Sequence, residues 1–117
     1  MSMDLVAAIA GKAMDGLYAR SAALAHNVAN ANAAAVSPLR VTFEDALSAA
    51  AAARPGDTTA AQRARIEAVQ PRTVATPDAL RLDREIADAS QTSARYALLA
   101  GVLTRALQLR QLSVRGG

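Results

Sequence analysis

Apolar and small residues recur at helical spacing in two long stretches without proline, one toward each end of the chain. In the first stretch, from Met3 to Ala35, they follow one another at alternating steps of three and four residues. Such a heptad repeat predicts a helix that packs along another helix. A helix of about 30 residues is roughly 45 Å long, too long for the interior of a compact domain of this size. The repeat positions are Ala7, Ala10, Met14, Leu17, Ser21, Leu24, Val28 and Ala31.

The second stretch, from about Leu80 to Val114, carries two apolar rows side by side. Apolar surface therefore covers more than half of the circumference of its later part, which is more than a single partner helix covers. We expect the two long helices to pair through their heptad rows and the remaining apolar surface to contact other chains. The first row is Leu82, Ile86, Ala89, Ser93, Tyr96, Ala100, Leu103 and Leu107, and the second is Leu99, Val102, Ala106 and Leu109.

The middle of the chain is irregular. Pro38 ends the first stretch, because proline cannot continue a helix and restricts the residue before it. Thr42 is a good N-cap, and the acidic residues that follow suit the first turn of a helix. That helix is a candidate third partner for the apolar rows, although it is too short to cover them fully. The predicted segments are a helix from Thr42 to about Ala53, a turn over 54–57 and short strands over 66–69 and 73–75.

These patterns predict a mainly α fold in a single domain over residues 1–117. Two long terminal helices pair as an antiparallel, coiled-coil-like hairpin, with a short helix and an irregular or small β segment between them. The predicted boundaries are an N-terminal helix over 1–36, the short helix, loops and β segment over 37–79, and a C-terminal helix over 80–115.

Composition adds a reason to expect association. Hydrophobic residues make up 52% of the chain, but roughly a quarter of all residues are alanine, tryptophan is absent and there is a single phenylalanine. Alanine buries little apolar area, so at about 25 cal/mol per Å² such a core stabilises a lone copy only weakly. Cysteine is also absent, which excludes a disulfide framework or a thiolate metal site.

The charge distribution does not indicate a nucleic-acid partner. The net charge is +3, and the basic excess lies from Arg95 onward. A nucleic-acid reader usually shows a denser basic patch with aromatic residues or a known motif. Arginines at the C-terminal end of a helix are explained by its dipole. They are Arg95, Arg105, Arg110 and Arg115.

Chemistry is equally sparse. The single histidine, His26, has no cysteine or histidine to share a metal with, and no glycine-rich phosphate loop follows a strand. Asp83, Glu85 and Asp88 lie where the dipole of the second helix favours negative charge, so we interpret them as helix-start charges. We predict no catalytic, cofactor-binding or metal-ligating residue, no enzymatic activity, no cofactor and no small-molecule substrate.

The segment "HNVANAN" over 26–32, preceded by "DGLYARSAALA" and followed by "RVTFEDAL", resembles the N-terminal signature of the bacterial flagellar rod and hook proteins. The terminal stretch "LDREIADASQTSARYALLAGVLTRALQLRQL", with its Arg95-Tyr96 pair, is similar to the C-terminal helix of that family. Within the family, the short length and the "RVTFEDAL" segment resemble the proximal rod proteins. The resemblance covers both ends of the chain, about two thirds of its length.

The resemblance implies a structural subunit of the flagellar basal-body rod, which crosses the periplasm and transmits torque from the motor to the hook. The implied partners are other copies of the chain, other rod proteins, the junction protein at the rod base and the membrane ring. The implied route is the flagellar type III export apparatus, which uses no cleaved signal peptide. This agrees with the first residues, where Asp4 stands in place of a basic signal region.

One departure from the family pattern carries a prediction. Where the family has Thr-Pro-Gly-Tyr after its asparagines, this chain has Ala-Ala-Ala-Val over 33–36, and the proline comes later, at Pro38. We therefore expect the first helix to continue about one turn further than in the family.

The asparagines of this segment lend themselves to two interpretations. Their amides help to end the helix, or they bond to neighbouring subunits and set the packing register. On the second interpretation the candidate subunit-packing residues are Asn27, Asn30, Asn32, Leu17, Leu24, Val28, Tyr96, Leu99, Leu103 and Leu107. Two other functions remain open alternatives to the rod: a self-associating helical-hairpin adaptor, and a small DNA- or membrane-binding helical protein.

Overall fold

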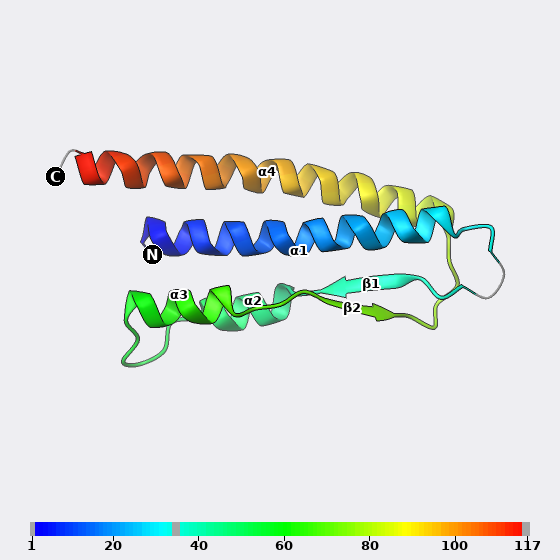
Figure 1. Cartoon of the computed structure of the whole chain (residues 1–117), viewed down its shortest axis with the longest axis horizontal. Helices are drawn as coiled ribbons and strands as arrows, with labels where there is room; N and C mark the ends of the chain where they lie inside the picture. The colour runs from blue at the N-terminus through cyan, green and yellow to red at the C-terminus, as the bar shows by residue number, and fades with distance from the viewer. Residues whose placement is uncertain (1, 34–35, 116–117) are drawn as a thin grey trace.

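Two long helices dominate the computed structural model, which describes residues 2–33 and 36–115. Helix α1 (Met3–Ala29) and helix α4 (Leu82–Arg115) run antiparallel along most of the molecule (Figure 1). The molecule measures 60 × 28 × 14 Å, and its radius of gyration of 17.2 Å exceeds the value of about 13 Å typical of a compact domain of this length. The predicted mainly helical fold with paired terminal helices is confirmed.

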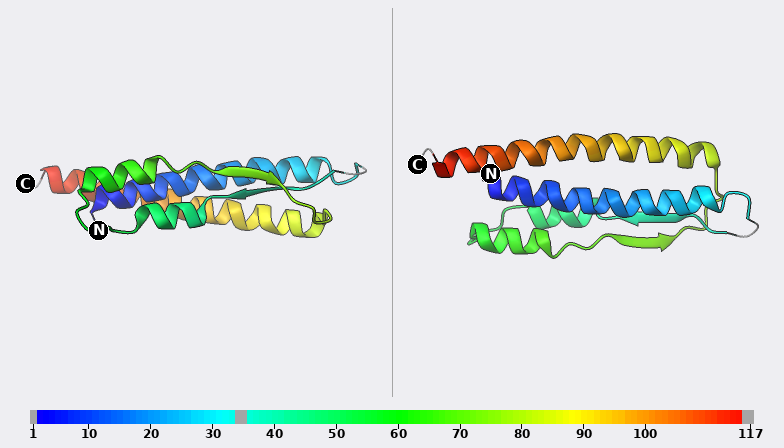
Figure 2. Two further views of the ribbon diagram at one scale, coloured as in Figure 1. Left: turned by 90° about the horizontal axis from the view of Figure 1, so that it is seen from below. Right: turned by 45° about the horizontal axis from the view of Figure 1, so that its top comes forward.

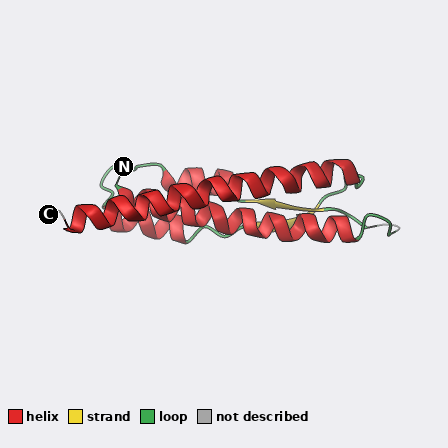
Figure 3. Ribbon diagram, turned by 90° about the horizontal axis from the view of Figure 1, so that it is seen from above, coloured by secondary structure: helices red, strands yellow, loops and turns green. Residues whose placement is uncertain are grey.

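The middle of the chain forms a layer on the other side of α1. It consists of strand β1 (Leu39–Thr42), helices α2 (Glu44–Ala51) and α3 (Thr59–Glu67), and strand β2 (Arg72–Ala75). The strands pair antiparallel, with Leu39 opposite Ala75 and Thr42 opposite Arg72. Helices α2 and α3 lie side by side beneath α1 (Figure 2). Helix α1 is thus the central layer, whereas α4 packs mainly on α1 and forms one outer face (Figure 3).

Helix α1 begins and ends at polar side chains. The Ser2 hydroxyl accepts a hydrogen bond from the backbone N–H of Leu5 at 3.3 Å, and Asp4 lies in the first turn. At the other end the amide of Asn30 donates to the His26 carbonyl oxygen at 2.8 Å. The backbone N–H of Asn30 reaches the same carbonyl at 3.1 Å, so the side chain adds a second donor there, and the chain turns.

The prediction that this helix continues to residue 36 is therefore wrong. It ends at Ala29, and Asn30 and the two residues after it form a turn. Residues 34 and 35, over which the extension was predicted, lie outside the described residues. The asparagines end the helix well before Pro38, so the displaced proline does not set its length.

The middle layer also differs from the prediction in detail. Helix α2 begins one residue late, with Phe43 rather than Thr42 at the N-cap position. A strand was predicted over 66–69, but Ile66 belongs to α3 and is fully buried. The Thr58 hydroxyl caps α3 by accepting from the Ala61 N–H at 3.0 Å. The strand predicted over 73–75 is confirmed as part of β2, whereas β1 was not predicted.

The main hydrophobic core lies between α1 and the middle layer. Helix α4 contributes to it only through the partly buried Leu99. The Phe43 ring packs directly on Gly16 of α1, where any Cβ would overlap the ring. The core residues are Leu5, Leu17, Ala23, Val41, Phe43, Leu47, Ala50, Ile66 and Val69.

The heptad row predicted for the second helix is not the row that faces α1. The buried residues of α4 are Glu85, Thr92 and Ala106, and the partly buried Leu99 falls in the same row at seven-residue intervals. Most of the predicted row is exposed, including Ile86 at 55%. Contacts of Glu85, described below, fix the rotation of α4 and leave much of its apolar surface facing outward.

Candidate functional site

A buried polar cluster joins α1, β1 and α4, and we call its members Asn27, Leu39, Arg40 and Glu85 the polar junction. The Asn27 amide accepts from the Leu39 N–H at 2.8 Å and donates to the Leu39 carbonyl at 3.0 Å. The same amide nitrogen donates to Glu85 at 3.0 Å. Asn27 and the side chain of Glu85 are both 0% exposed. One asparagine therefore binds a strand backbone and a carboxylate 58 residues away.

An arginine completes the junction. The guanidinium of Arg40 donates to both carboxylate oxygens of Glu85, at 2.7 and 3.1 Å. Burial opposes ionisation of Glu85, but the hydrogen bonds from Arg40 and Asn27 outweigh it and hold the pKa of Glu85 below its ordinary value. The hydrogen bond to Glu85 in turn raises the pKa of Arg40. A charged, two-pronged pair of this kind fixes both position and orientation.

We expect acid to loosen this junction. A carboxylate whose folded-state pKa is lowered stabilises the fold above its ordinary pKa of 4.5, and this contribution is lost as pH falls through the lower folded-state value. The Glu85→Gln variant should be less stable at pH 7 and should lose less stability than the native chain between pH 7 and about pH 3. Urea unfolding at both pH values measures this difference.

The comparison isolates Glu85, because the lowered pKa values of Glu44 and Asp57 act equally in both proteins. Parallel loss of stability in the native chain and in Glu85→Gln would contradict the assignment of the acid response to the junction.

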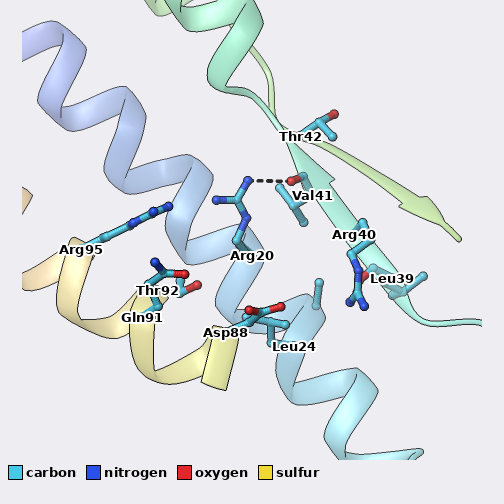
Figure 4. Close-up of a pocket in the computed structure, with 11 residues that line it drawn as sticks. Arg20, Leu24, Leu39, Arg40, Val41, Thr42, Asp88, Gln91, Thr92 and Arg95 are labelled. Carbon is cyan, nitrogen blue, oxygen red and sulfur yellow. Dashed lines mark hydrogen bonds between the residues drawn. The ribbon is translucent and has the colours of Figure 1, made fainter. Parts of the chain in front are cut away.

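A cavity of about 370 Å³ opens beside the junction, between α1, β1 and α4 (Figure 4). Arg20 donates to the Val41 carbonyl at 2.8 Å and to both oxygens of Glu44 at 2.6 and 2.7 Å. Arg40 is paired with Glu85, so two of the three arginines at this cavity are already neutralised. The cavity therefore has little excess charge to hold an anion. It is lined by Arg20, Ala23, Leu24, Leu39, Arg40, Val41, Thr42, Asp88, Gln91, Thr92 and Arg95.

Metal-ligating side chains do not gather in the described ranges, 2–33 and 36–115. No group of three or more histidine, aspartate or glutamate side chains gathers there as a metal site would require. His26 is exposed on the last turn of α1, and its ring nitrogen lies 3.5 Å from the Asn30 amide.

The outer surface of α4 is the most unusual feature of the molecule. Twelve large hydrophobic residues of the described part of the chain are exposed, and nine of them belong to α4. These side chains lie on two flanks of the helix, since Tyr96 lines one cavity and Leu98, Val102 and Leu109 line another, and large uncovered apolar surfaces mark contacts with a partner. The nine are Leu82, Ile86, Tyr96, Leu98, Val102, Leu107, Leu109, Leu112 and Val114.

The structure divides the predicted subunit-packing residues into two groups. Asn27, Leu17 and Leu24 are buried within the chain, so their side chains pack against their own chain. The others are exposed or partly exposed: Asn30, Asn32, Val28, Tyr96, Leu99, Leu103 and Leu107. The Asn27 amide, which was predicted to bond to a neighbouring subunit, is fully buried and bonds to Leu39 and Glu85 of its own chain. Asn30 fits the first interpretation of the asparagines, because its amide helps to end the helix.

Sequence reasoning missed the two charged members of the junction. Glu85 was interpreted as a helix-start charge. It does lie in the first turn of α4, but its side chain is fully buried, which a solvated helix-start charge would not be. Arg40 was not singled out at all. Seven-residue steps back from Ala106 and Leu99 of the second predicted row reach Thr92 and Glu85, but nothing local identifies the partner of Glu85.

Comparison of the chain with known protein families, with curated proteins and with solved structures finds no match. A separate search for membrane spans among the described helices finds none long and apolar enough to cross a bilayer.

Proposed function

We propose that this chain is a structural subunit of the bacterial flagellar basal-body rod, closest to the proximal rod proteins, and that it has no catalytic role. It assembles by helix packing into the axial tube that transmits torque from the motor to the hook. The observation that carries the proposal is the uncovered apolar surface of α4, on the same helix whose sequence resembles the C-terminal helix of rod proteins.

Three further features support assembly over catalysis. The molecule is an elongated pair of helices whose axis suits lengthwise packing in a tube. Within the described residues, no group of three or more histidine, aspartate or glutamate side chains gathers as a metal site would require. Its core contains one aromatic residue, Phe43, so burial of the α4 surface by neighbours adds stability that one copy lacks.

The partners under this proposal are other copies of the chain, other rod proteins, the junction protein at the rod base and the membrane ring. The chain reaches the rod, which spans the periplasm, through the flagellar type III export apparatus and without a cleaved signal peptide. A weakly stabilised fold suits export of an unfolded chain.

Deletion and complementation in the native bacterium test the proposal. We expect the deletion strain to lose motility and its basal bodies to lack a complete rod in electron micrographs, and the native gene to restore both. A Leu98→Asp variant should fail to restore the rod, because it puts a charge at the centre of the exposed α4 surface. Complete rods in the deletion strain would overturn the proposal.

A second measurement separates the rod from the adaptor alternative. The purified chain is expected to sediment mainly as a monomer and to assemble only with other rod components. Stable oligomers of the chain by itself would instead favour a self-associating adaptor.

A further inference from the structure

An apolar groove runs along one side of α4, between that helix and the two helices nearest to it. Two cavities of about 450 and 440 Å³ lie end to end along it and share Leu98 as a lining residue. Ile9 of α1 and Leu47 of α2 line the first cavity, and Val102 and Leu109 of α4 line the second. We call this surface the α4 groove.

The groove is bordered by two arginines that form no ion pair among the residues that the structure describes. Arg95 lines the first cavity and Arg105 the second, and both are exposed. Neither forms an ion pair with any residue in 2–33 or 36–115, whereas Arg110 on the same helix is paired with Asp4 at 2.9 Å. No acidic residue occurs in α4 after Asp88. Ten residues of helix place these two arginines about 15 Å apart along the axis.

We propose that the α4 groove binds an acidic amphipathic helix of a different protein. Apolar side chains of that helix fill the two cavities, and its carboxylates, spaced about three turns apart, pair with Arg95 and Arg105. This inference rests on the proposed function in that it names the chemistry of a partner for the same α4 surface.

Charge favours this occupant over a second copy of the groove. If two α4 grooves packed together, Arg95 and Arg105 of each copy would face a surface whose one acidic lining residue, Glu44, is already paired with Arg20. Like charges brought together at an interface cost several kcal/mol and act against such pairing. Carboxylates from a partner helix instead neutralise both arginines as the apolar centre is covered.

Shape favours a helix over an anionic membrane surface. The groove is concave, with α1 and α2 as its far wall, and a row of side chains fits it better than a planar bilayer does. Membrane-surface helices also place aromatic side chains at the interface. Both tyrosines of this chain, Tyr18 and Tyr96, line a different cavity on the other side of α4.

Two matched peptides of about 20 residues, long enough to form isolated helices, test the inference. Both carry the same leucine pattern; one has glutamate on its polar face and the other lysine. Fluorescence anisotropy with the full chain should show at least tenfold tighter binding of the acidic peptide. The Arg95→Glu/Arg105→Glu variant should reverse this preference, which a merely destabilised fold would not do.

The matched control is Arg54→Glu/Arg72→Glu, which makes the same charge change at two exposed arginines away from the groove. It should bind the acidic peptide within about twofold of the native chain, since distant exposed charges are screened. Equal binding of both peptides, binding of neither, or no change in the Arg95→Glu/Arg105→Glu variant would overturn the inference. So would binding to anionic lipid vesicles without a preference between the peptides.

The native bacterium distinguishes failure of this inference from failure of the rod proposal. If Arg95→Glu/Arg105→Glu supports normal rods where the deletion strain has none, the rod proposal stands and the inference is wrong. If the deletion strain builds complete rods but the peptide preference and its reversal are observed, the inference stands for another assembly.

Discussion

Replacing Asn27 with alanine is expected to lower the free energy of unfolding by about 3 kcal/mol. The substitution removes three hydrogen bonds at once: two to the Leu39 backbone and one to Glu85. It leaves the Leu39 N–H without its side-chain acceptor, the Leu39 carbonyl with the Arg40 guanidinium at 3.2 Å as its remaining side-chain donor, and the buried Glu85 carboxylate with one donor fewer. Unsatisfied buried groups cost about 1–3 kcal/mol each, so the expected loss of stability is larger than that of a single hydrogen bond.

Urea unfolding of the purified chain, followed by circular dichroism, measures this loss. Asn32→Ala is the matched control, because Asn32 is exposed in the turn and should change stability by less than about 0.5 kcal/mol. Asn30→Ala should fall between them, at about 1 kcal/mol, since it removes only the bond that ends α1. If Asn27→Ala unfolded at the same urea concentration as Asn32→Ala, the junction would not be structural.

The long helices were predictable because their signal is local and repeated. Both helices follow from the absence of proline and from apolar residues that recur at steps of three and four, and neither signal depends on contacts with the rest of the chain. The boundary at Asn30 was harder, because two local preferences compete there. Alanines favour continuation, while the Asn30 amide bonds the His26 carbonyl and favours a stop.

The polar junction could not be predicted in the same way, because its partners are far apart in sequence. Asn27 looks like a weak helix former until Leu39 is placed beside it by the return of the chain, and Glu85 looks like a dipole charge until Arg40 approaches. Local patterns report which face of a helix is apolar. They do not report that a buried ion pair decides which face turns inward.

This limit explains the error in the rotation of α4. The first apolar row was predicted to pair with α1, but the row that faces α1 contains Glu85 and Thr92 together with Leu99 and Ala106 of the second predicted row. Arg40 and Asn27 bind Glu85 and hold that row against α1, so apolar residues of both rows remain exposed. The same interaction that sets the monomer fold thus leaves the apolar surface available to partners.

Replacing Gly16 with alanine is expected to destabilise the chain by about 2 kcal/mol, although alanine is normally the better helix former. The reason is its contact with Phe43. A Cβ at position 16 would lie within 3.0 Å of three ring carbons, and the ring is only 5% exposed, with the core packed around it. The ring must shift, and Arg20, whose guanidinium lies 5.0 Å from the ring centroid, must shift with it.

Gly11→Ala is the matched control on the same helix, because nothing lies within 4 Å of a Cβ at that position. That variant should gain about 0.5–1 kcal/mol, the ordinary advantage of alanine over glycine in a helix. Opposite signs for the two substitutions, measured by urea unfolding, assign the effect to the Phe43 contact rather than to helix propensity. A gain in both variants would mean that Phe43 moves freely and that its packing against α1 does not hold the middle layer in place.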